Sequence, residues 1–250
     1  GNRILKEGEP INSFYGYKLD GTWKTSEAEE AKIFGAQPGD LKINCADIQR
    51  HVNEDGTVYY TGFDPEGNEV TYDINNPYDD QQAQQVLGHP QPDWTMGLKN
   101  SFTWKNFDFS VYLYWRYGQM INYSMLGRFN TSASNNFPTY FDYWTEETGD
   151  QNHRYPALNA AKDLNQMDGW SGLTFVDGSF WKVKNVTIGY TLPKNILKKI
   201  GAENIRIYGT ITNPFVFAKS DLLKDYDPEM AGNLDYPLTK QMVFGVNVTF

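Results

Sequence analysis

Apolar residues occupy every second position along several segments of the chain, and the final segment is the most regular. From residue 242 onward, large apolar side chains alternate with smaller or polar ones. The apolar set is Met242, Phe244, Val246, Val248 and Phe250. A period of two is typical of a β-strand, because successive side chains point to opposite faces. The segment 240–250 is therefore predicted to be a strand with one apolar face.

Two further segments, 94–104 and 107–118, alternate in the same way and are separated by only two residues. In a two-residue hairpin the flanking residues pair on one face of the sheet, and here they are Trp104 and Phe107. This pairing puts the apolar residues of both segments on the same face. Asn106 suits the turn position that needs positive φ, because asparagine tolerates the left-handed region.

Three more segments complete the predicted set of strands. The segments 180–192 and 204–213 alternate clearly, and a weaker pattern covers 11–19. Within 180–192 the apolar phase changes midway, which indicates a β-bulge or a change of environment near Asn185. The chain is therefore predicted to be all-β, with antiparallel strands.

Long polar segments at 20–93, 119–179 and 214–238 separate these strands, whereas the other connections are short. The first is expected to contain a hairpin of its own, turning at 65–68. In an antiparallel arrangement, the short turns fall on one side and the long segments on the other. Outer-membrane β-barrels show this asymmetry, and strands of about 9–11 residues suit a tilted membrane crossing. A soluble β-sandwich gives the same alternation, so both architectures stay open.

The composition narrows the classes of partner and chemistry. The net charge is -9 with a pI near 4.8, and Lys and Arg are scattered, which excludes nucleic acid as a partner. No apolar run approaches the length of a membrane helix. The single cysteine, Cys45, excludes an internal disulfide framework. Without a His/Cys cluster or a Ser-His-Asp order, we predict no metal, no cofactor and no enzyme activity.

Two short motifs invite a chemical interpretation. The stretch "HVNEDGTVYYTG" resembles a calcium loop, but His51 occupies the first ligand position and Gly62 the position of the bidentate glutamate. We expect a simple turn there instead. The motif "YDPE" contains Asp227 and Glu229, a pair that a glycosidase could use at a suitable separation. A role in anchoring a loop is preferred.

An aromatic-rich stretch, "FPTYFDYWTEETGD", is the candidate binding region. Flat apolar rings here could stack against sugar rings, while nearby polar side chains bind hydroxyl groups. The candidate rings are Tyr140, Tyr143, Trp144 and Trp170, and the candidate polar partners are Asp142, Asn152 and Arg154. The alternative is that these rings pack the loop onto its neighbours or onto a partner protein.

The ordered set of motifs resembles one known family. In chain order the segments are "FYGYKLDGTW", "AQPGDLK", "GHPQPDWTMGLKNSFTWKNFDFSVYLYWRYGQMI", "FVDGSFWKVKNVTIGYTLP", "IRIYGTITNPFVF", "YDPE", "YP" and "FGVNVTF". Together they resemble the C-terminal part of the SusC/RagA family of TonB-dependent outer-membrane transporters. The likeness covers almost the whole chain, and its specificity lies in the order of the motifs.

The resemblance implies that residues 1–250 are the C-terminal portion of a 22-stranded transmembrane β-barrel with long extracellular loops. The plug domain and the segment that contacts TonB are expected to be absent from this chain. Family members reside in the bacterial outer membrane, in contact with its lipid, and work with a SusD-like surface lipoprotein. They import oligosaccharides, or in some cases peptides, with energy supplied through the TonB complex.

The last strand carries a further implication of the resemblance. A C-terminal strand that ends in phenylalanine is similar to the signal read by the barrel-assembly machinery. The residues concerned are Phe244, Val246, Val248 and Phe250. A strand that simply faces lipid would show the same pattern, and the two roles are compatible.

The main alternative to a transporter segment is a soluble, secreted, β-rich carbohydrate-binding module. The two differ in what covers the apolar strand residues. The barrel predicts that they form one continuous band exposed to lipid, and the module predicts that they are buried between two sheets. The residues that discriminate are Phe107, Phe109, Val111, Phe244, Val246 and Val248.

Overall fold

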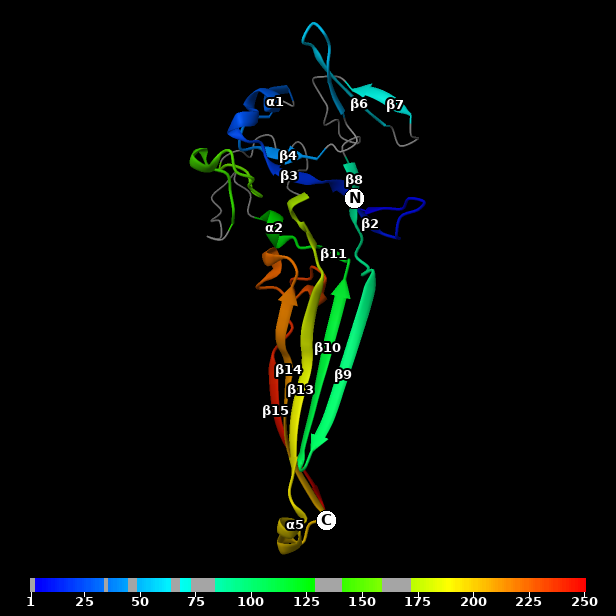
Figure 1. The fold of residues 1–250 in the computed structure, drawn as a ribbon, viewed down its shortest axis with the longest axis vertical. Helices are drawn as coiled ribbons and strands as arrows, with labels where there is room; N and C mark the ends of the chain where they lie inside the picture. The colour runs from blue at the N-terminus through cyan, green and yellow to red at the C-terminus, as the bar shows by residue number, and fades with distance from the viewer. Residues whose placement is uncertain are drawn as a thin grey trace. The chain divides into compact units, whose positions relative to one another are not determined.

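The computed structural model is built mostly of antiparallel strands with a few short helices (Figure 1). It describes residues 3–33, 36–44, 49–63, 68–72, 84–128, 141–158 and 172–250. The chain divides into two compact units. The first unit comprises Gly1–His89 and Asn122–Phe175, and the second comprises Pro90–Ile121 and Val176–Phe250. Within the described ranges, no helix is both long enough and apolar enough to cross a membrane.

The second unit contains a five-stranded antiparallel sheet in the order β15-β14-β13-β10-β9 (Figure 1). Its strands are β9 (Trp94–Trp104), β10 (Phe107–Tyr117), β13 (Phe180–Thr191), β14 (Asn204–Ala218) and β15 (Gln241–Thr249). Every neighbouring pair in this sheet is antiparallel. All five correspond to segments whose alternation predicted a strand.

The hairpin between β9 and β10 has the expected register but a different turn. Phe107 pairs with Trp104, as the two-residue connection requires. The residue with positive φ is Lys105, at 54°, so the expectation for Asn106 is wrong. Asn106 instead donates a hydrogen bond from Nδ2 to the carbonyl oxygen of Thr191, at 2.7 Å. Its amide side chain therefore fastens the hairpin to the end of β13.

A β-bulge in β13 explains the change of apolar phase. On β10, Tyr112 pairs with Asn185 and the next residue, Leu113, pairs with Val183, so Lys184 is the extra residue. A single inserted residue reverses the side on which the following side chains point. The irregularity predicted near Asn185 is therefore confirmed, one residue away.

Strand β14 is longer than its pattern indicated. It continues past Asn213 and through Pro214 to Ala218, so the long connection does not begin at 214 as expected. The pairing with β13 skips Asn213 and Pro214, and Asn213 has φ of 51°. Proline lacks the N–H that a regular ladder uses, and a bulge accommodates it without ending the strand.

The first unit contains short sheets rather than one long loop. The segment expected to be a polar connection at 20–93 contains several strands, and its predicted hairpin is present as β6 and β7. The sheets are β1 (Arg3–Ile4), β2 (Ser13–Tyr17) and β8 (Gln84–Gly88); β3 (Leu19–Thr22) and β4 (Leu41–Ile43); and β5 (Gln49–Val52), β6 (Val58–Phe63) and β7 (Glu69–Tyr72). The short helices here are η1 (Thr25–Glu27), α1 (Ala28–Ile33), α2 (Met125–Arg128) and η2 (Glu146–Thr148).

Two buried clusters form the core of the first unit, and Leu19 packs against both. One cluster is centred on Trp23, whose side chain is almost fully buried. In the other, the rings of Phe141 and Tyr155 stack with centroids 4.2 Å apart and an interplanar angle of 6°. The apolar residues of β3 and β4 thus find partners far along the chain, which holds the segment 141–158 onto this unit.

The remaining elements are short connections. They are β11 (Met120–Asn122), β12 (Phe175–Asp177), α5 (Lys194–Ile200), η3 (Asp221–Leu223) and η4 (Pro228–Met230). The helix α5 follows Pro193 and ends at Gly201, which has φ of 69°. Glycine at this position is the usual way to end a helix in the left-handed region, because it lacks a Cβ. This helix forms the short connection between β13 and β14.

Candidate functional site

The five-stranded sheet has one continuous apolar face, produced by the register of its strands. Across β9 and β10 the pairs include Phe102 with Phe109. Across β10 and β13 they include Trp115 with Trp181 on the far side of the bulge. Ile207 of β14 pairs with Val246 of β15, which extends the face to the last strand. Side chains that alternate along each strand therefore gather on one side of all five strands.

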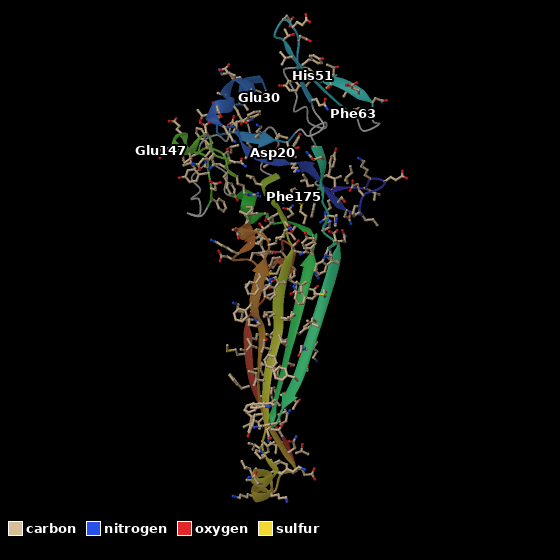
Figure 2. The ribbon with its side chains drawn as sticks, viewed as in Figure 1. Asp20, Glu30, His51, Phe63, Glu147 and Phe175 are labelled. Atoms are coloured by element: carbon tan, nitrogen blue, oxygen red, sulfur yellow. The ribbon has the colours of Figure 1, made fainter. Side chains whose placement is uncertain are left out.

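This apolar face is exposed in the described part of the chain; Figure 2 draws the side chains along its strands as sticks. Phe244 is 84% exposed, Val246 58% and Phe107 48%. Phe109 and Val111 are half-buried, because they lie on the inner strand β10 between neighbouring side chains. Burial between two sheets, as expected for a soluble module, is not observed for these residues. The exposure favours the expectation of a lipid-facing band.

A group of aromatic rings lies at the end of the apolar face that is farther from the β9–β10 turn. Trp181 stacks on Phe217 with ring centroids 4.1 Å apart, and Trp115 lies 6.4 Å from Trp181. Trp94 stacks on Tyr117 at 5.7 Å. These rings belong to four adjacent strands. Rows of amphipathic rings are typical of strands that cross the boundary between lipid and water.

The opposite face is polar and contains an ion pair that spans β13. Arg206 of β14 donates to Asp108 of β10 from Nε at 2.9 Å and from Nη2 at 2.6 Å. Between them lies Gly189, where a Cβ would stand only 2.6 Å from Arg206 Nη2 and even closer to Asp108. Glycine on the central strand therefore makes room for the bidentate pair. Sequence alternation marked this face as polar but did not identify the pair.

The loop that follows β14, residues 219–240, is fastened to the polar face by Lys182. Its Nζ donates to Asp227 Oδ2 at 2.6 Å and to Glu229 Oε2 at 2.8 Å. The Lys182 side chain is 0% exposed. Lys184, the bulge residue, also forms an ion pair with Glu229. The loop-anchoring role expected for the "YDPE" carboxylates is therefore confirmed.

The local geometry explains how these carboxylates are presented. Asp227 is the N-cap of η4, and its Oδ1 accepts a hydrogen bond from the Glu229 N–H at 3.0 Å. Burial acts to raise the pKa of Glu229, but the hydrogen bonds and charges of Lys182 and Lys184 outweigh it, so this pKa lies below its ordinary value. Both lysines therefore face an ionised Glu229 carboxylate at neutral pH.

Of the rings predicted to bind substrate, the structure describes two, and Tyr140 and Trp170 lie outside the described residues. Tyr143 is half-buried and packs against the cluster that contains Phe141 and Tyr155. Trp144 is half-buried and donates from Nε1 to the carbonyl oxygen of Gly149 at 3.1 Å. A Cβ at Gly39 would lie 2.9 Å from the Trp144 ring, so the indole rests against bare backbone. Both rings pack the loop onto its own unit, and their binding role stays a prediction.

The polar partners predicted for a sugar also serve the fold. Arg154 Nη2 donates to the carbonyl oxygen of Leu173 at 2.6 Å. Asp142 Oδ1 lies 2.6 Å from His153 Nδ1. The other ring nitrogen, His153 Nε2, lies 3.0 Å from the carbonyl oxygen of Thr148. Because a carbonyl and an ionised carboxylate can only accept, both nitrogens donate when both bonds are formed, and His153 is then a cation.

The pKa of His153 agrees with this geometry. Burial of the ring acts to lower the pKa, but the bonds to Thr148 and Asp142 and the charge of Asp142 outweigh it, so the pKa is raised above its ordinary value. The sequence contained no sign of this arrangement, because one partner is a backbone carbonyl. A histidine directly before an arginine gave no pattern that could have indicated it.

The calcium-like stretch forms a turn. Asp55 Oδ1 accepts hydrogen bonds from the backbone N–H of Thr57 at 2.9 Å and from its hydroxyl at 2.6 Å. Gly56 N–H donates to the carbonyl oxygen of Asn53 at 2.9 Å. This is the Asx-type turn that the sequence favoured over a metal loop. In the portion of the chain that the structure describes, no group of three or more His, Cys, Asp or Glu side chains could hold a metal ion.

The fold indicates a class of protein before any comparison is made. The chain contains an antiparallel β-sheet with one apolar and one polar face, of the kind found in membrane β-barrels. No family model matches the chain. Among curated proteins, TonB-dependent receptor P26 of Formosa agariphila is 28% identical over 273 residues, covering 100% of this chain and 24% of the relative. TonB-dependent receptor SusC of Bacteroides thetaiotaomicron is 25% identical over 244 residues, covering 94% of this chain and 22% of that protein.

Solved structures agree on the fold. The RagAB peptide importer in its open-open state matches with a TM-score of 0.62 and 20% identity, over 100% of this chain and 23% of that chain. The RagAB peptide transporter matches with a TM-score of 0.59 and 19% identity. This chain spans about a quarter of the length of the relatives it matches. The predicted resemblance to the SusC/RagA family of TonB-dependent receptors is therefore confirmed.

Proposed function

We propose that this chain is part of the barrel wall of a TonB-dependent nutrient importer in the bacterial outer membrane. The observation that carries the proposal is the continuous apolar face across five strands, opposite a polar face. In this arrangement the apolar face contacts outer-membrane lipid and the polar face lines the lumen. The complete barrel has 22 strands, as the family resemblance implies.

The connections give the sheet a direction in the membrane. Short links join β9 to β10 and β13 to β14, at one end of the strands. The segments that join β10 to β13 and β14 to β15 are long and leave from the other end. In outer-membrane barrels the short turns are periplasmic and the long loops are extracellular. The 219–240 loop, anchored by Lys182, then lies toward the extracellular end of the lumen.

The partners and the substrate follow from the same proposal. A SusD-like surface lipoprotein contacts the extracellular loops, and the TonB complex acts through parts of the protein outside this chain. The imported nutrient is an oligosaccharide or a peptide, and oligosaccharide is the substrate that the sequence favoured. Tyr140, Tyr143, Trp144 and Trp170 remain the proposed contacts for it. The protein is a transporter and not an enzyme.

Spin labels on β15 test the orientation of the sheet. In the full-length protein inserted in lipid vesicles, Val246→Cys and Asn247→Cys are labelled in turn, in a Cys45→Ser background. We expect the label at 246 to collide mainly with oxygen, which concentrates in lipid, and the label at 247 to collide mainly with a water-soluble nickel chelate. Equal protection of the label at 246 from both reagents would indicate a packed protein core and favour a soluble module.

A further inference from the structure

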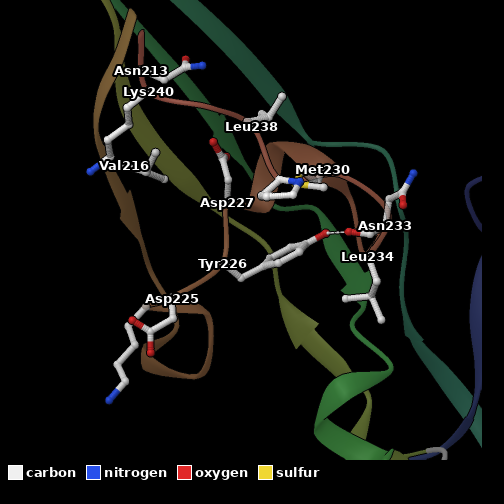
Figure 3. Close-up of a pocket in the computed structure, with 12 residues that line it drawn as sticks. Asn213, Val216, Asp225, Tyr226, Asp227, Met230, Asn233, Leu234, Leu238 and Lys240 are labelled. Carbon is white, nitrogen blue, oxygen red and sulfur yellow. Dashed lines mark hydrogen bonds between the residues drawn. The ribbon is translucent and has the colours of Figure 1, made fainter.

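Hollows lie at both ends of the five-stranded sheet. One, of about 530 Å³, lies beside the 219–240 loop, where the Tyr226 hydroxyl donates to the carbonyl oxygen of Asn233 at 2.9 Å (Figure 3). Another, of about 560 Å³, lies at the end with the short connections. Its lining includes Lys105 of the β9–β10 turn and Lys194 of α5. Lysines from two separate connections therefore adjoin at this end.

Hydrogen bonds hold the β9–β10 turn close to the start of α5. The N–H of Thr191 donates to the carbonyl oxygen of Asn106 at 2.9 Å. Asn106 returns a bond from Nδ2 to the carbonyl oxygen of Thr191 at 2.7 Å. The helix begins three residues later, at Lys194, and its buried Leu197 holds it against the rest of the unit. The exposed side chains of the turn and of α5 thus belong to one surface.

This surface is basic, although the whole chain has a net charge of -9. The helix contributes three lysines and no acidic residue. None of the lysines forms an ion pair within the ranges that the structure describes. Of the carboxylates that line the hollow, Asp108 is paired with Arg206, which leaves Glu203. Distant charges are screened by salt, so the local balance, which is positive, decides what binds here. The four residues of this basic surface are Lys105, Lys194, Lys198 and Lys199.

Apolar side chains are exposed on the same helix. Ile196 is 42% exposed and Ile200 53%. They are four residues apart and so share one side of α5, whereas Lys194 and Lys198, with the same spacing, share another. A helix with cations on one side and apolar residues on the other is typical of a segment that lies at a membrane surface. A soluble anion would leave the two isoleucines in water.

The β9–β10 turn joins the basic surface to the apolar face of the sheet. Trp104, at the end of β9, pairs with Phe107 on that face and is 63% exposed. The Nζ of Lys105 lies 4.8 Å from the centroid of the Trp104 ring. Lysines at the end of a lipid-facing segment extend to the polar boundary of the bilayer, and aromatic rings gather there. A cation therefore lies at the edge of the apolar face, where the phosphate groups of a bilayer begin.

We propose that the basic surface binds the headgroups of anionic phospholipids. The lipid phosphates pair with its four lysines, and Ile196 and Ile200 contact the upper part of the acyl chains. The inference rests on the proposed place of the sheet in the barrel wall. In that orientation the short connections are periplasmic, so the lipids belong to the inner leaflet of the outer membrane.

Fluorescence quenching at α5 tests the proposal. The full-length protein carries an NBD fluorophore on Asn195→Cys, in a Cys45→Ser background, and is inserted in phosphatidylcholine vesicles. Increasing amounts of nitroxide-labelled phosphatidylglycerol or nitroxide-labelled phosphatidylcholine are then included. We expect phosphatidylglycerol to give half-maximal quenching at an about fivefold lower mole fraction, because one lysine near an anionic surface contributes roughly this factor in affinity.

Matched double variants separate the basic surface from net charge. Lys194→Gln with Lys198→Gln should remove the preference for phosphatidylglycerol. Lys6→Gln with Lys18→Gln changes the net charge equally, at exposed positions of the first unit, and should keep the preference. Equal quenching by the two lipids, or an equal effect of the two double variants, would overturn the proposal.

Two further outcomes also count against it. Inorganic phosphate that relieves the quenching would indicate a site for the free anion rather than for a lipid surface. Absence of quenching by either lipid would place α5 away from the bilayer and overturn the proposal. The spin label at 246 reports on the barrel wall independently, so failure at α5 with lipid contact at 246 leaves the proposed function intact.

Discussion

Lys182 and Asp227 are 45 residues apart in the sequence, and their charged atoms lie 2.6 Å apart on the polar face of the sheet. The lysine is fully buried beneath the loop that contains the aspartate. A buried charge that loses its partner is strongly destabilising, because the remaining charge stays removed from water. The relationship therefore makes Lys182 a main anchor of the 219–240 loop, beside the Lys184–Glu229 ion pair.

Replacement of this lysine should release the loop. Lys182→Met keeps the length of the side chain but leaves Asp227 and Glu229 facing an apolar group, at an expected cost of about 3–5 kcal/mol. Limited proteolysis of the full-length protein should then cleave within 219–240 much faster than in wild type. Lys198→Met, on the exposed surface of α5, is the matched control and should have no effect. Unchanged cleavage in Lys182→Met would show that the loop is held by its other contacts, among them the Lys184–Glu229 ion pair, and not by Lys182.

A methyl group at Gly189 should disturb the ion pair that passes over it. We expect Gly189→Ala to cost about 1 kcal/mol, because Arg206 and Asp108 must move apart and their bridge is partly exposed to solvent. The measurement is thermal unfolding of the full-length protein in detergent. In an Asp108→Asn background the same change should cost less, since the bridge is already weakened. If Gly189→Ala costs the same free energy in the Asp108→Asn background as in the wild type, the proposed steric conflict with the ion pair is contradicted.

The segment that contains His153 should loosen as the pH rises. Its folded pKa lies above the unfolded value, so protonated His153 stabilises the fold fully below the unfolded pKa, and this stability is lost as the pH rises through the folded pKa. The protection factors of residues 141–155 against hydrogen exchange, which correct for faster intrinsic exchange at high pH, should therefore be higher at pH 5.5 than at pH 8.5 in the full-length protein. His153→Gln should remove most of this difference. An equal pH response in the variant would assign the effect to another group.

The aromatic residue directly after β15, Phe250, provides a test of the predicted assembly signal. In the full-length protein, Phe250→Ala should slow insertion into the outer membrane and lower the amount of receptor displayed at the cell surface. Thr249→Ala changes the neighbouring residue on the polar face and serves as the control. Surface display of Phe250→Ala at the wild-type level would remove the assembly role and leave only a lipid-facing side chain.

The long strands could be predicted because their signal is local. In β9 and β10 each apolar residue identifies its own face, and a two-residue connection fixes which residues are opposite each other. The phase change in β13 even indicated the bulge beside Asn185. The short strands of the first unit contain too few residues for the alternation to stand out. The strand predicted at 204–213 continues to Ala218 as β14, because a bulge at Asn213 and Pro214 accommodates the proline.

The sequence by itself determined the antiparallel strands, the two faces of the sheet and the family resemblance, because these properties repeat along contiguous residues. Only the tertiary structure decided which distant groups meet. It brought the buried Lys182 to the carboxylates of the "YDPE" motif and placed a backbone carbonyl against His153. It also turned Trp144 toward the backbone of its own unit. Such contacts depend on chain segments folding back over long separations, which no local pattern of residues specifies.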